Sequence, residues 1–477
     1  MNPDIINLVD MHSGKNEELF SKYVNPQLAR VLKTIGFSRN YVRAKGPYLY
    51  DNEGNEYLDF LAGYGVFNIG RNHETVKNEL KKAIDADWPS MVQMDTPLLA
   101  GLLAENLLSV VNGQNVESNK IGSTVINDLD TVFLTNSGTE SIEGAIKFAK
   151  KATGRSKILS WDHSFHGLTT GSLSLNGNKE FRNGFGNLLP GCETIPFNDL
   201  DILEKELKKG DVAAFIIEPV QGKGVYIADP AFYVGAERLC KQYGTLLICD
   251  EVQTGFGRTG KWFAHHHWGI KPDIVTVAKA LSGGFIPVGA IVYRREIYKK
   301  VFCSMDNCVV HSNTFGRNVL AMTAGLASIA VIEKEHIVEN SAAMGSKLIN
   351  GLRSMIDKYE MLSEVRGLGL MVGIEFAAPS SFSLKAGWKI VHAVNKGLFG
   401  QMVVVPLMCD HRILTQVAGH NVDIVKLLPP LIIDESHVNR FLTAFEQVMH
   451  ECHKFPGSAW TIGKKLATEA LKTRSVI

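Results

Sequence analysis

A lysine follows an apolar run and opens a stretch of small residues. Lys279 comes directly after DIVTVA (273–278) and begins KALSGG, so we expect its amino group at the carboxyl end of a sheet. Burial there favours the neutral amine, which is the nucleophile that forms an imine with a carbonyl carbon. A lysine at a strand end can also be purely structural, so its neighbours must decide its role.

An aspartate ends a second apolar run, TLLICD (245–250). The carboxylate of Asp250 inside a sheet needs a cationic or hydrogen-bonding partner to offset its loss of hydration. A pyridinium nitrogen is one such partner, and an aspartate beside it keeps the ring protonated as an electron sink. The alternative is an aspartate that caps the following turn.

A third segment, NSGTE (136–140), stands between a strand-like run and a helix-like run. Ser137, Gly138 and Thr139 would offer hydroxyl and backbone N–H groups at the positive end of the helix dipole, which suits an anion such as a phosphate. A helix N-cap formed by Thr139 is compatible with that interpretation.

Two further patterns point to other chemistry and are set aside. GFGRTG (255–260) matches the dinucleotide-binding G-x-G-x-x-G. However, Asp250 and Glu251 would stand close to a pyrophosphate, TGKWFAHH begins a helix poorly, and no acidic strand end follows about 20 residues on. The run from His265 to His267 lacks a second ligand cluster, so we interpret it as an exposed turn and predict no metal site.

The elements that position these residues alternate along the chain. TVFLT (131–135), VAAFIIEPV (212–220), LLICDE (246–251), DIVTVA (273–278) and VGAIVY (288–293) predict a buried parallel sheet with crossover helices. Ile142, Ala145, Ile146 and Ala149 form one apolar face of a helix that begins near Gly138.

The two ends of the chain predict a smaller α+β unit. GPYLYDNEGNEYLDFLAGYG reads as two short strands around an Asn-Glu-Gly turn, and helical stretches at 335–358, 385–397 and 435–452 surround the strand-like LGLMVGIEF (368–376) and QMVVVPL (401–407). We therefore predict residues 1–75 as the N-terminal segment of a small domain, 76–335 as a large cofactor-binding domain and 336–477 as the C-terminal small domain.

Composition describes an ordinary globular protein. The 477 residues hold 50 Lys and Arg against 49 Asp and Glu, with 45% apolar residues, which argues against nucleic acid as a partner and against disorder. The uncharged apolar stretch 318–332 is shorter than a membrane span, so no membrane partner is predicted. Asp4 and Asp10 stand where a signal peptide would be basic and then apolar. The seven cysteines are odd in number and show no CxxC spacing, which suggests a reducing compartment. We therefore expect a cytoplasmic protein.

With these residues in place, the chain resembles a known family. The stretch 246–292, from LLICDEVQTGFGRTG to KALSGGFIPVGAIV, is similar to the cofactor-attachment signature of class III aminotransferases, which include ornithine, acetylornithine, 4-aminobutyrate and putrescine aminotransferases. NSGTESIEGAIKFAK, SFHG, EPVQG, SNTFGRN and LLPPL extend the resemblance over nearly the whole chain. It implies pyridoxal 5′-phosphate (PLP) as cofactor, the α/β fold type I architecture of aspartate aminotransferase, and a homodimer with shared active sites.

The resemblance also implies roles for individual residues. Lys279 would be the Schiff-base lysine and proton carrier, and Asp250 would pair with the pyridine nitrogen. Gln253 would bind the phenolic oxygen, and Phe165 and Val252 would cover the two ring faces. The phosphate would be held by Ser137, Gly138, Thr139 and, from the other subunit, Thr314, while His166 and Glu218 match positions near the cofactor.

Three positions depart from the amino-acid-specific members of the family. Lys426 replaces an arginine before LLPPL, Lys223 replaces the glutamate of a QGE turn, and Leu168 replaces an arginine after FHG. Because lysine lacks the planar guanidinium fork, these changes favour a pocket less dedicated to α-carboxylates. The alternative is that both lysines are solvated surface residues and Arg366 takes the carboxylate.

The function predicted from these residues is amino-group transfer between a primary amine and a carbonyl acceptor by a ping-pong mechanism. The segment FLAGYGVFNIGRNH, with Tyr64 and Val66, looks most like the putrescine-type branch, which favours a terminal amine. The alternatives are an ornithine- or acetylornithine-type enzyme and a PLP-dependent aminomutase or racemase. A dehydrogenase would need nicotinamide binding, and a degenerate binding module would lack Lys279 or Asp250.

Overall fold

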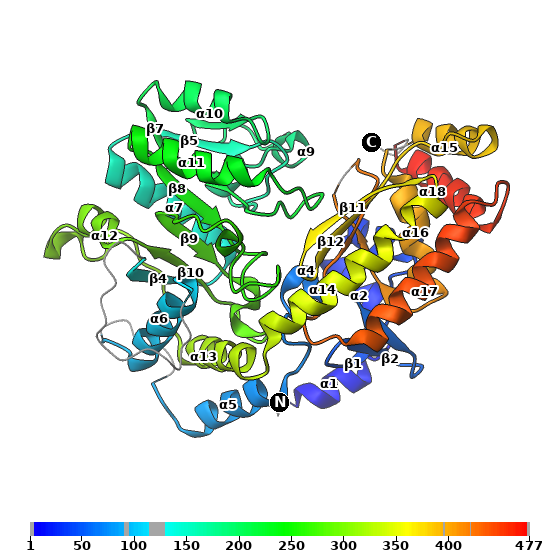
Figure 1. Cartoon of the computed structure of the whole chain (residues 1–477). Coiled ribbons are helices and arrows are strands. Elements are labelled where there is room, and N and C mark those ends of the chain that lie inside the picture. Colours follow the sequence, from blue (N-terminus) through cyan, green and yellow to red (C-terminus); the bar gives the residue numbers. More distant parts are fainter. Residues whose placement is uncertain (1–3, 90–94, 114–128, 395, 420, 475–477) are drawn as a thin grey trace.

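The computed structural model describes residues 4–89, 95–113, 129–394, 396–419 and 421–474. A seven-stranded sheet forms the centre of the larger half of the molecule (Figure 1). In spatial order it consists of β4 (Thr131–Thr135), β10 (Gly289–Tyr293), β9 (Ile274–Val277), β8 (Leu246–Asp250), β7 (Val212–Ile217), β5 (Lys157–Trp161) and β6 (Cys192–Ile195).

The direction of one strand differs from the sequence prediction. The strands β5 to β9 pair in parallel, but β10 pairs antiparallel with both β9 and β4. The sheet is therefore mainly parallel, as predicted, and β10 is the strand that departs from the parallel direction. The apolar run that predicted the strand is the same in either direction, because a strand buried on both faces is continuously apolar whether its neighbours run parallel or antiparallel.

Helices cover both faces of this sheet. Side chains alternate between the faces along each strand, and strands such as β7 are buried throughout, so each face presents apolar side chains that need cover. Ala214 and Ile216 pack with α7 (Gly138–Thr153) and α12 (Arg295–Val301), whereas Phe215 and Ile217 join the core on the opposite face. The other helices of this half are α5 (Glu74–Asp85), α6 (Leu98–Val111), α8 (Thr170–Ser174), α9 (Lys179–Arg182), α10 (Leu200–Leu207), α11 (Pro230–Tyr243) and α13 (Val319–Lys334).

Two four-stranded sheets form the second half. The first joins β1 (Tyr41–Lys45), β2 (Tyr48–Asp51) and β3 (Glu56–Asp59) to β13 (Ile413–Leu414), and the second has the order β11 (Leu362–Leu368), β12 (Met371–Phe376), β15 (Ile424–Leu427), β14 (Gln416–Val417). The predicted hairpin around the Asn-Glu-Gly turn is confirmed by the β2–β3 pairing. The parallel β3–β13 pair brings the segment before residue 75 together with the C-terminal part of the chain. The predicted boundaries at 75 and 335 remain a prediction.

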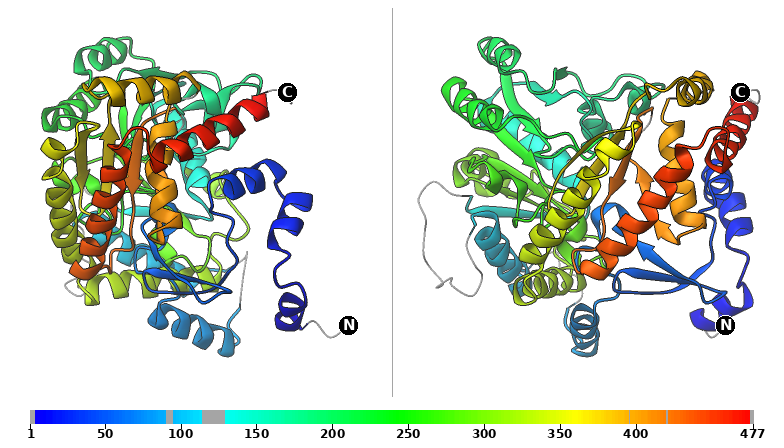
Figure 2. Two further views of the ribbon diagram at one scale, coloured as in Figure 1. Left: turned by 90° about the vertical axis from the view of Figure 1, so that its right-hand side faces the viewer. Right: turned by 45° about the vertical axis from the view of Figure 1, so that its right-hand side comes forward.

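Helices of the C-terminal part flank the second sheet, and short helices begin the chain. They are α14 (Ile337–Arg353), α15 (Phe382–Val394), α16 (Leu398–Cys409), α17 (Glu435–Cys452) and α18 (Ser458–Arg474), with α1 (Ile5–Met11), α2 (Asn16–Tyr23), α3 (Pro26–Thr34) and α4 (Ala62–Gly65) at the beginning. Figure 2 shows α1 to α3 at the periphery of the molecule. The prediction for 435–452 is confirmed, whereas those for 335–358 and 385–397 differ from α14 and α15 by two to five residues at their ends.

The segment QMVVVPL is a helix and not a strand. It lies inside α16, where Met402, Val403, Val404 and Leu407 are all buried. An apolar run that is buried on all sides lacks the alternation of apolar and polar residues that distinguishes a strand from a helix. Its three valines favoured a strand, and that prediction is wrong.

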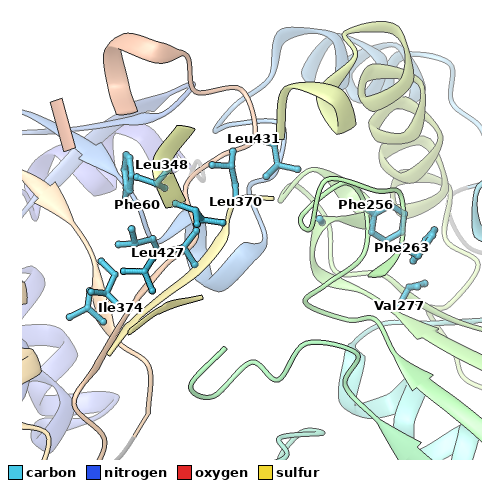
Figure 3. Packing of buried hydrophobic residues seen from close by; sticks show 14 of the residues in the cluster. Phe60, Phe256, Phe263, Val277, Leu348, Leu370, Ile374, Leu427 and Leu431 are labelled. Carbon is cyan, nitrogen blue, oxygen red and sulfur yellow. The ribbon is translucent and has the colours of Figure 1, made fainter. Parts of the chain in front are cut away.

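One hydrophobic core connects the two halves (Figure 3). Phe256, Phe263 and Val277 belong to the side of the large sheet, and Leu370 and Leu427 to the side of the second small sheet. Within the described residues no single helix is long and apolar enough to cross a membrane; α15 and α16, bent by 100° to each other, meet the criteria of length and composition only as a pair.

Candidate active site

A cavity of about 870 Å³ opens at the carboxyl edge of the large sheet and is closed on its other side by the loop after β14. Four strands that run in the same direction, β4, β7, β8 and β9, end there, and open α/β sheets bind ligands at this edge. The predicted residues that line the cavity are Tyr64, Val66, Ser137, Gly138, Thr139, Phe165, His166, Glu218, Lys223, Asp250, Val252, Gln253, Lys279 and Lys426.

Asp250 lies at the base of the cavity and is held by neighbouring groups. It is buried, its Oδ2 is 2.8 Å from Nδ1 of His166, and its Oδ1 accepts from the backbone N–H of Val252 at 3.1 Å. The turn-capping alternative is therefore also present, in the bond to Val252. The buried Nε2 of His166 has no hydrogen-bond partner among the described residues, so the ring is fixed through Asp250 alone.

Lys279 follows β9 with a positive φ of 45°, a backbone region that non-glycine residues seldom adopt. Burial lowers the pKa of Lys279, and the nearby carboxylates of Asp250 and Glu218 act in the opposite direction. A lowered pKa increases the share of neutral amine, which is the form that attacks a carbonyl carbon and accepts a proton.

Glu218 ties two segments of the cavity wall together. Its Oε1 accepts from the backbone N–H of Phe165 and its Oε2 from that of Gly222, both at 2.8 Å. Burial raises the pKa of Glu218, and the charge of Asp250 adds to the increase while His166 opposes it. The carboxyl group thus holds the aromatic ring of Phe165 in place beside the cavity.

The amino end of α7 forms another part of the wall. Ser137 is the N-cap, and its side chain accepts from the backbone N–H of Glu140. The predicted N-cap at Thr139 is wrong, because the N-cap lies two residues earlier, at Ser137, and the Thr139 hydroxyl is engaged with Thr169 and Ser172 at 2.7 Å each. The backbone N–H groups of this turn lie at the positive end of a 16-residue helix.

Two side chains could cover the faces of a flat ring. Phe165 lines the cavity and meets Phe181 edge to face, with ring centroids 5.5 Å apart. Val252 lines it as well and packs so tightly on Gly138 that a Cβ there would lie 2.7 Å from Val252 Cγ1. Gly138 is therefore required for the approach of the β8 loop to α7.

Neither predicted substrate lysine is a solvated surface residue. Lys223 and Lys426 are 8% and 6% exposed and both line the cavity, so the alternative placing them in solvent is wrong. Lys426 Nζ donates to the carbonyl of Gly222 at 2.6 Å and to Gln253 Oε1 at 3.4 Å. Burial, helped by the charges of Lys279 and Arg258, lowers the pKa of Lys426 to about 7.

Arg366 does not take the role that the sequence left open for it. Its guanidinium forms ion pairs with Glu364 (2.7 Å) and Glu375 (2.5 Å) and donates to the carbonyl of Gly224, outside the residues that line the cavity. Gln253, expected near a phenolic oxygen, lines the cavity and donates from Nε2 to the carbonyl of Tyr64 at 2.9 Å.

Two predicted residues lie outside the cavity that one chain forms. Leu168 is 58% exposed and does not line the cavity, although Gly167 before it does, and its contact with substrate remains a prediction. Thr314 is also exposed, on the segment between α12 and α13, and its role toward a second subunit remains a prediction.

The histidine run 265–267 and the segment GFGRTG form parts of the fold, and in the part of the chain that the structure describes neither completes the site that its pattern resembles. His265 is buried and its Nδ1 lies 2.9 Å from Glu251, whereas His266 and His267 are half-buried. The expected exposed turn is therefore wrong, and the three histidines belong to the 3-10 turn Ala264–His267. Within the described residues no group of three or more His, Cys, Asp and Glu side chains is placed to hold a metal. GFGRTG is followed by turns and this 3-10 turn, without the helix that a dinucleotide site needs.

Sequence reasoning missed part of the cavity wall. Asn136, Phe181, Ser282, Gly284, Phe285, Ile286, Gln416, Val417, Ala418 and Gly419 also line it. The segment 416–419 reaches the cavity because Gln416 pairs across the sheet with Lys426, a register that no local pattern encodes. Phe181, one of two aromatic residues in a polar segment, was the one available signal.

The arrangement fits PLP. A buried carboxylate suits the pyridine nitrogen, the amino end of a long helix suits the phosphate, and a lysine of lowered pKa suits the aldehyde. An α/β fold with these groups at the carboxyl edge of its sheet defines a PLP-dependent transferase of fold type I.

Comparison with known proteins gives the family. The family model "Aminotransferase class-III" matches residues 33–449, so the chain belongs to the class III aminotransferases, which depend on PLP. The putrescine aminotransferase of Pectobacterium atrosepticum is 35% identical over 463 residues, covering 94% of this chain and 91% of that protein. The acetylornithine aminotransferase of Methanocaldococcus jannaschii is 36% identical, covering 87% and 94%.

A further relative is longer than this chain. The aminotransferase PigE of Serratia sp. is 32% identical over 468 residues, which cover 91% of this chain but 53% of PigE, so the chain spans about half of that relative. Among solved structures, the ornithine aminotransferase of Toxoplasma gondii superposes with a TM-score of 0.78 at 26% identity over 95% of this chain and all of that one. An amine transaminase of an uncultivated Pseudomonas species, PLP-bound, gives 0.73 at 25% identity over 87% and 95%.

Proposed function

We propose that this class III aminotransferase takes the amino group from a primary amine whose amino-bearing carbon is terminal and passes it to a carbonyl acceptor. The proposed substrate class rests on the hydrogen-bond partners and the burial of Lys223 and Lys426. Both are held by protein partners, and Lys426 has a pKa near 7, so neither resembles the free, permanently charged fork that grips an α-carboxylate.

When bound, PLP supplies an electron sink that stabilises negative charge on the substrate carbon. Lys279 would hold the cofactor, and its lowered pKa suits a base that takes up and returns the substrate proton. Its position after β9, fixed by the unusual backbone conformation, sets where it can take up and return the proton.

Asp250 provides a fixed negative charge at the other side of the site. Its carboxylate is buried, oriented by His166 and by the backbone N–H of Val252, and therefore favours a protonated partner nitrogen. Glu218 holds Phe165 and the turn at Gly222, so that the ring-covering and substrate-facing walls keep their spacing. Amino transfer in two half-reactions then follows a ping-pong scheme.

A second candidate has its own support. Acetylornithine aminotransferases 34–38% identical to this chain favour an amino acid as donor. In that case a carboxylate would have to displace the protein partners of Lys223 or Lys426, and binding would weaken as the pH rises through the pKa of Lys426, because the amine loses its charge.

The donor class can be tested with the PLP-loaded protein and no acceptor. Putrescine or pentylamine is expected to convert the visible absorbance of the bound cofactor to that of its amine form, because one half-reaction needs no second substrate. Ornithine and acetylornithine serve as matched amino-acid donors. Ornithine and acetylornithine also carry a terminal amine, so conversion by these two donors with none by the alkylamines would contradict a pocket for amines that lack a carboxylate. No conversion by any donor would contradict aminotransferase activity itself.

We also propose that the protein is a homodimer whose active sites are shared between subunits. In support, α1 and α2 contribute no buried residue within the described chain, and they expose Ile5, Ile6, Val9, Met11 and Tyr23. The segment that carries Thr314 also exposes Val309 and Phe315. Apolar patches of this kind are typical of subunit interfaces.

A complementation experiment tests the shared site. Lys279→Ala and Thr314→Glu are each expected to inactivate the enzyme, the second because a carboxylate repels the cofactor phosphate. Unfolding and refolding an equal mixture should restore about a quarter of the wild-type activity, since half of the dimers are then hybrids with one intact site. Each variant refolded alone is the control. A mixture that stays inactive would place Thr314 in its own subunit's site and contradict the proposal.

A further inference from the structure

A short helix beside the cavity carries a carboxylate that neutralises one of its lysines. Lys223 Nζ donates to Glu180 Oε1 at 2.6 Å and to Asn178 Oδ1 at 2.7 Å. Glu180 belongs to the four-residue helix α9, and its neighbour Phe181 lines the cavity. The ion pair therefore joins α9 to the cavity wall.

The stem of Lys223 has little freedom to point elsewhere. A Cβ on Gly419, itself a lining residue, would lie 2.5 Å from both Cγ and Cε of Lys223. A buried ammonium group needs an opposite charge close by, and the carboxylate at 2.6 Å provides it. Two of the three donors of Nζ are occupied, and the net charge of the pair is zero.

Lys223 and Lys279 line the same cavity. Lys279 is within electrostatic reach of Glu218, Glu218 accepts from Gly222, and Lys223 is the next residue along the wall. A donor whose amino end is at Lys279 therefore extends along a wall that includes Lys223, Phe181 and the segment 416–419. A carboxylate at its far end would compete with Glu180 for Lys223.

Resting on the proposed aminotransferase function, we propose that Glu180 is a specificity-determining residue that excludes carboxylate-bearing substrates by holding Lys223 in an ion pair. Amines whose far end is uncharged bind without disturbing the pair. A structural role of the pair, as a tether for α9, would predict a uniform loss of activity in its variants and no change in preference.

The test compares Glu180→Gln with wild type on matched substrates. Alkylamines and ω-amino acids of equal length, about three to six carbons, differ only in the terminal carboxylate. Glu180→Gln keeps the shape but frees the charge of Lys223, so KM for the ω-amino acids is expected to fall about tenfold while KM for the alkylamines stays unchanged. Pentanoate, which cannot react, should bind more tightly to this variant, and its dissociation constant measured by calorimetry should fall about tenfold.

Three further variants make the outcome decisive. Glu180→Gln combined with Lys223→Met should lose the gain in affinity for ω-amino acids. Glu193→Gln, which removes one of the ion pairs of Lys157 away from the cavity, should show no gain. Lys223→Met alone removes the ammonium group while the carboxylate of Glu180 stays beside the cavity. It should weaken the binding of ω-amino acids relative to alkylamines, which decides the matter if Glu180→Gln folds poorly. An unchanged preference in Glu180→Gln, or a gain that persists without Lys223, would overturn the inference, whereas wild-type inactivity with every donor would instead contradict the proposed function.

Discussion

Replacing Lys279 by alanine is expected to lower kcat at least about 10⁴-fold with every amine donor, the largest effect of any single substitution in the cavity. The side chain has two tasks, to hold the cofactor and to carry the proton, and the other lysines of the wall are engaged with Gly222 and Glu180. Single-turnover absorbance measurements at saturating amine separate this loss from weaker binding.

A chemical measurement checks the position of the covalent bond independently of activity. Borohydride treatment of the loaded wild type should leave the cofactor attached to the peptide that contains Lys279, as seen by mass spectrometry, and Lys279→Ala should show no attachment. Lys299→Ala, at an exposed lysine, is the control for removing a positive charge. Attachment at Lys223 or Lys426 in the wild type would contradict the assignment.

Asp250→Asn is expected to have the second largest effect, a loss of about 10²- to 10⁴-fold in kcat together with weaker cofactor binding. The amide keeps the shape and part of the hydrogen bonding but removes the charge that His166 and Val252 orient, so a protonated partner nitrogen is no longer favoured. Titration of the apoprotein with PLP, followed by absorbance, measures the binding part.

The matched control for this variant is Asp357→Asn, which removes a carboxylate from the exposed surface. It should leave kcat and cofactor affinity unchanged. If Asp250→Asn retained wild-type kcat, the carboxylate would serve only to cap the turn after β8, which is the alternative that the sequence had left open. Asp250 would then have no part in keeping the cofactor nitrogen protonated.

The sequence was informative where a residue's role depends on its own segment. Asp250 ends an apolar run that forms a strand, and Ser137 and Lys279 each lie two residues after the end of one, so their common edge followed from the strands alone. Helix α7 followed from its period of apolar residues. The same local reasoning failed for QMVVVPL, because an apolar run buried on every side carries no period, and for β10, whose direction is set by its neighbours.

The tertiary structure decided which side chains meet. Lys223 and Glu180 are 43 residues apart, and Lys426 and Gly222 are 204 apart, so nothing in either segment indicates the contact. Packing between these segments buries both lysines, and burial, helped by the charges of Lys279 and Arg258, lowers the pKa of Lys426 to about 7. Local pattern thus determined the chemistry at Lys279 and Asp250, whereas charge and burial at the substrate wall arose from packing between distant segments, because burial and electrostatic environment depend on every neighbour in space.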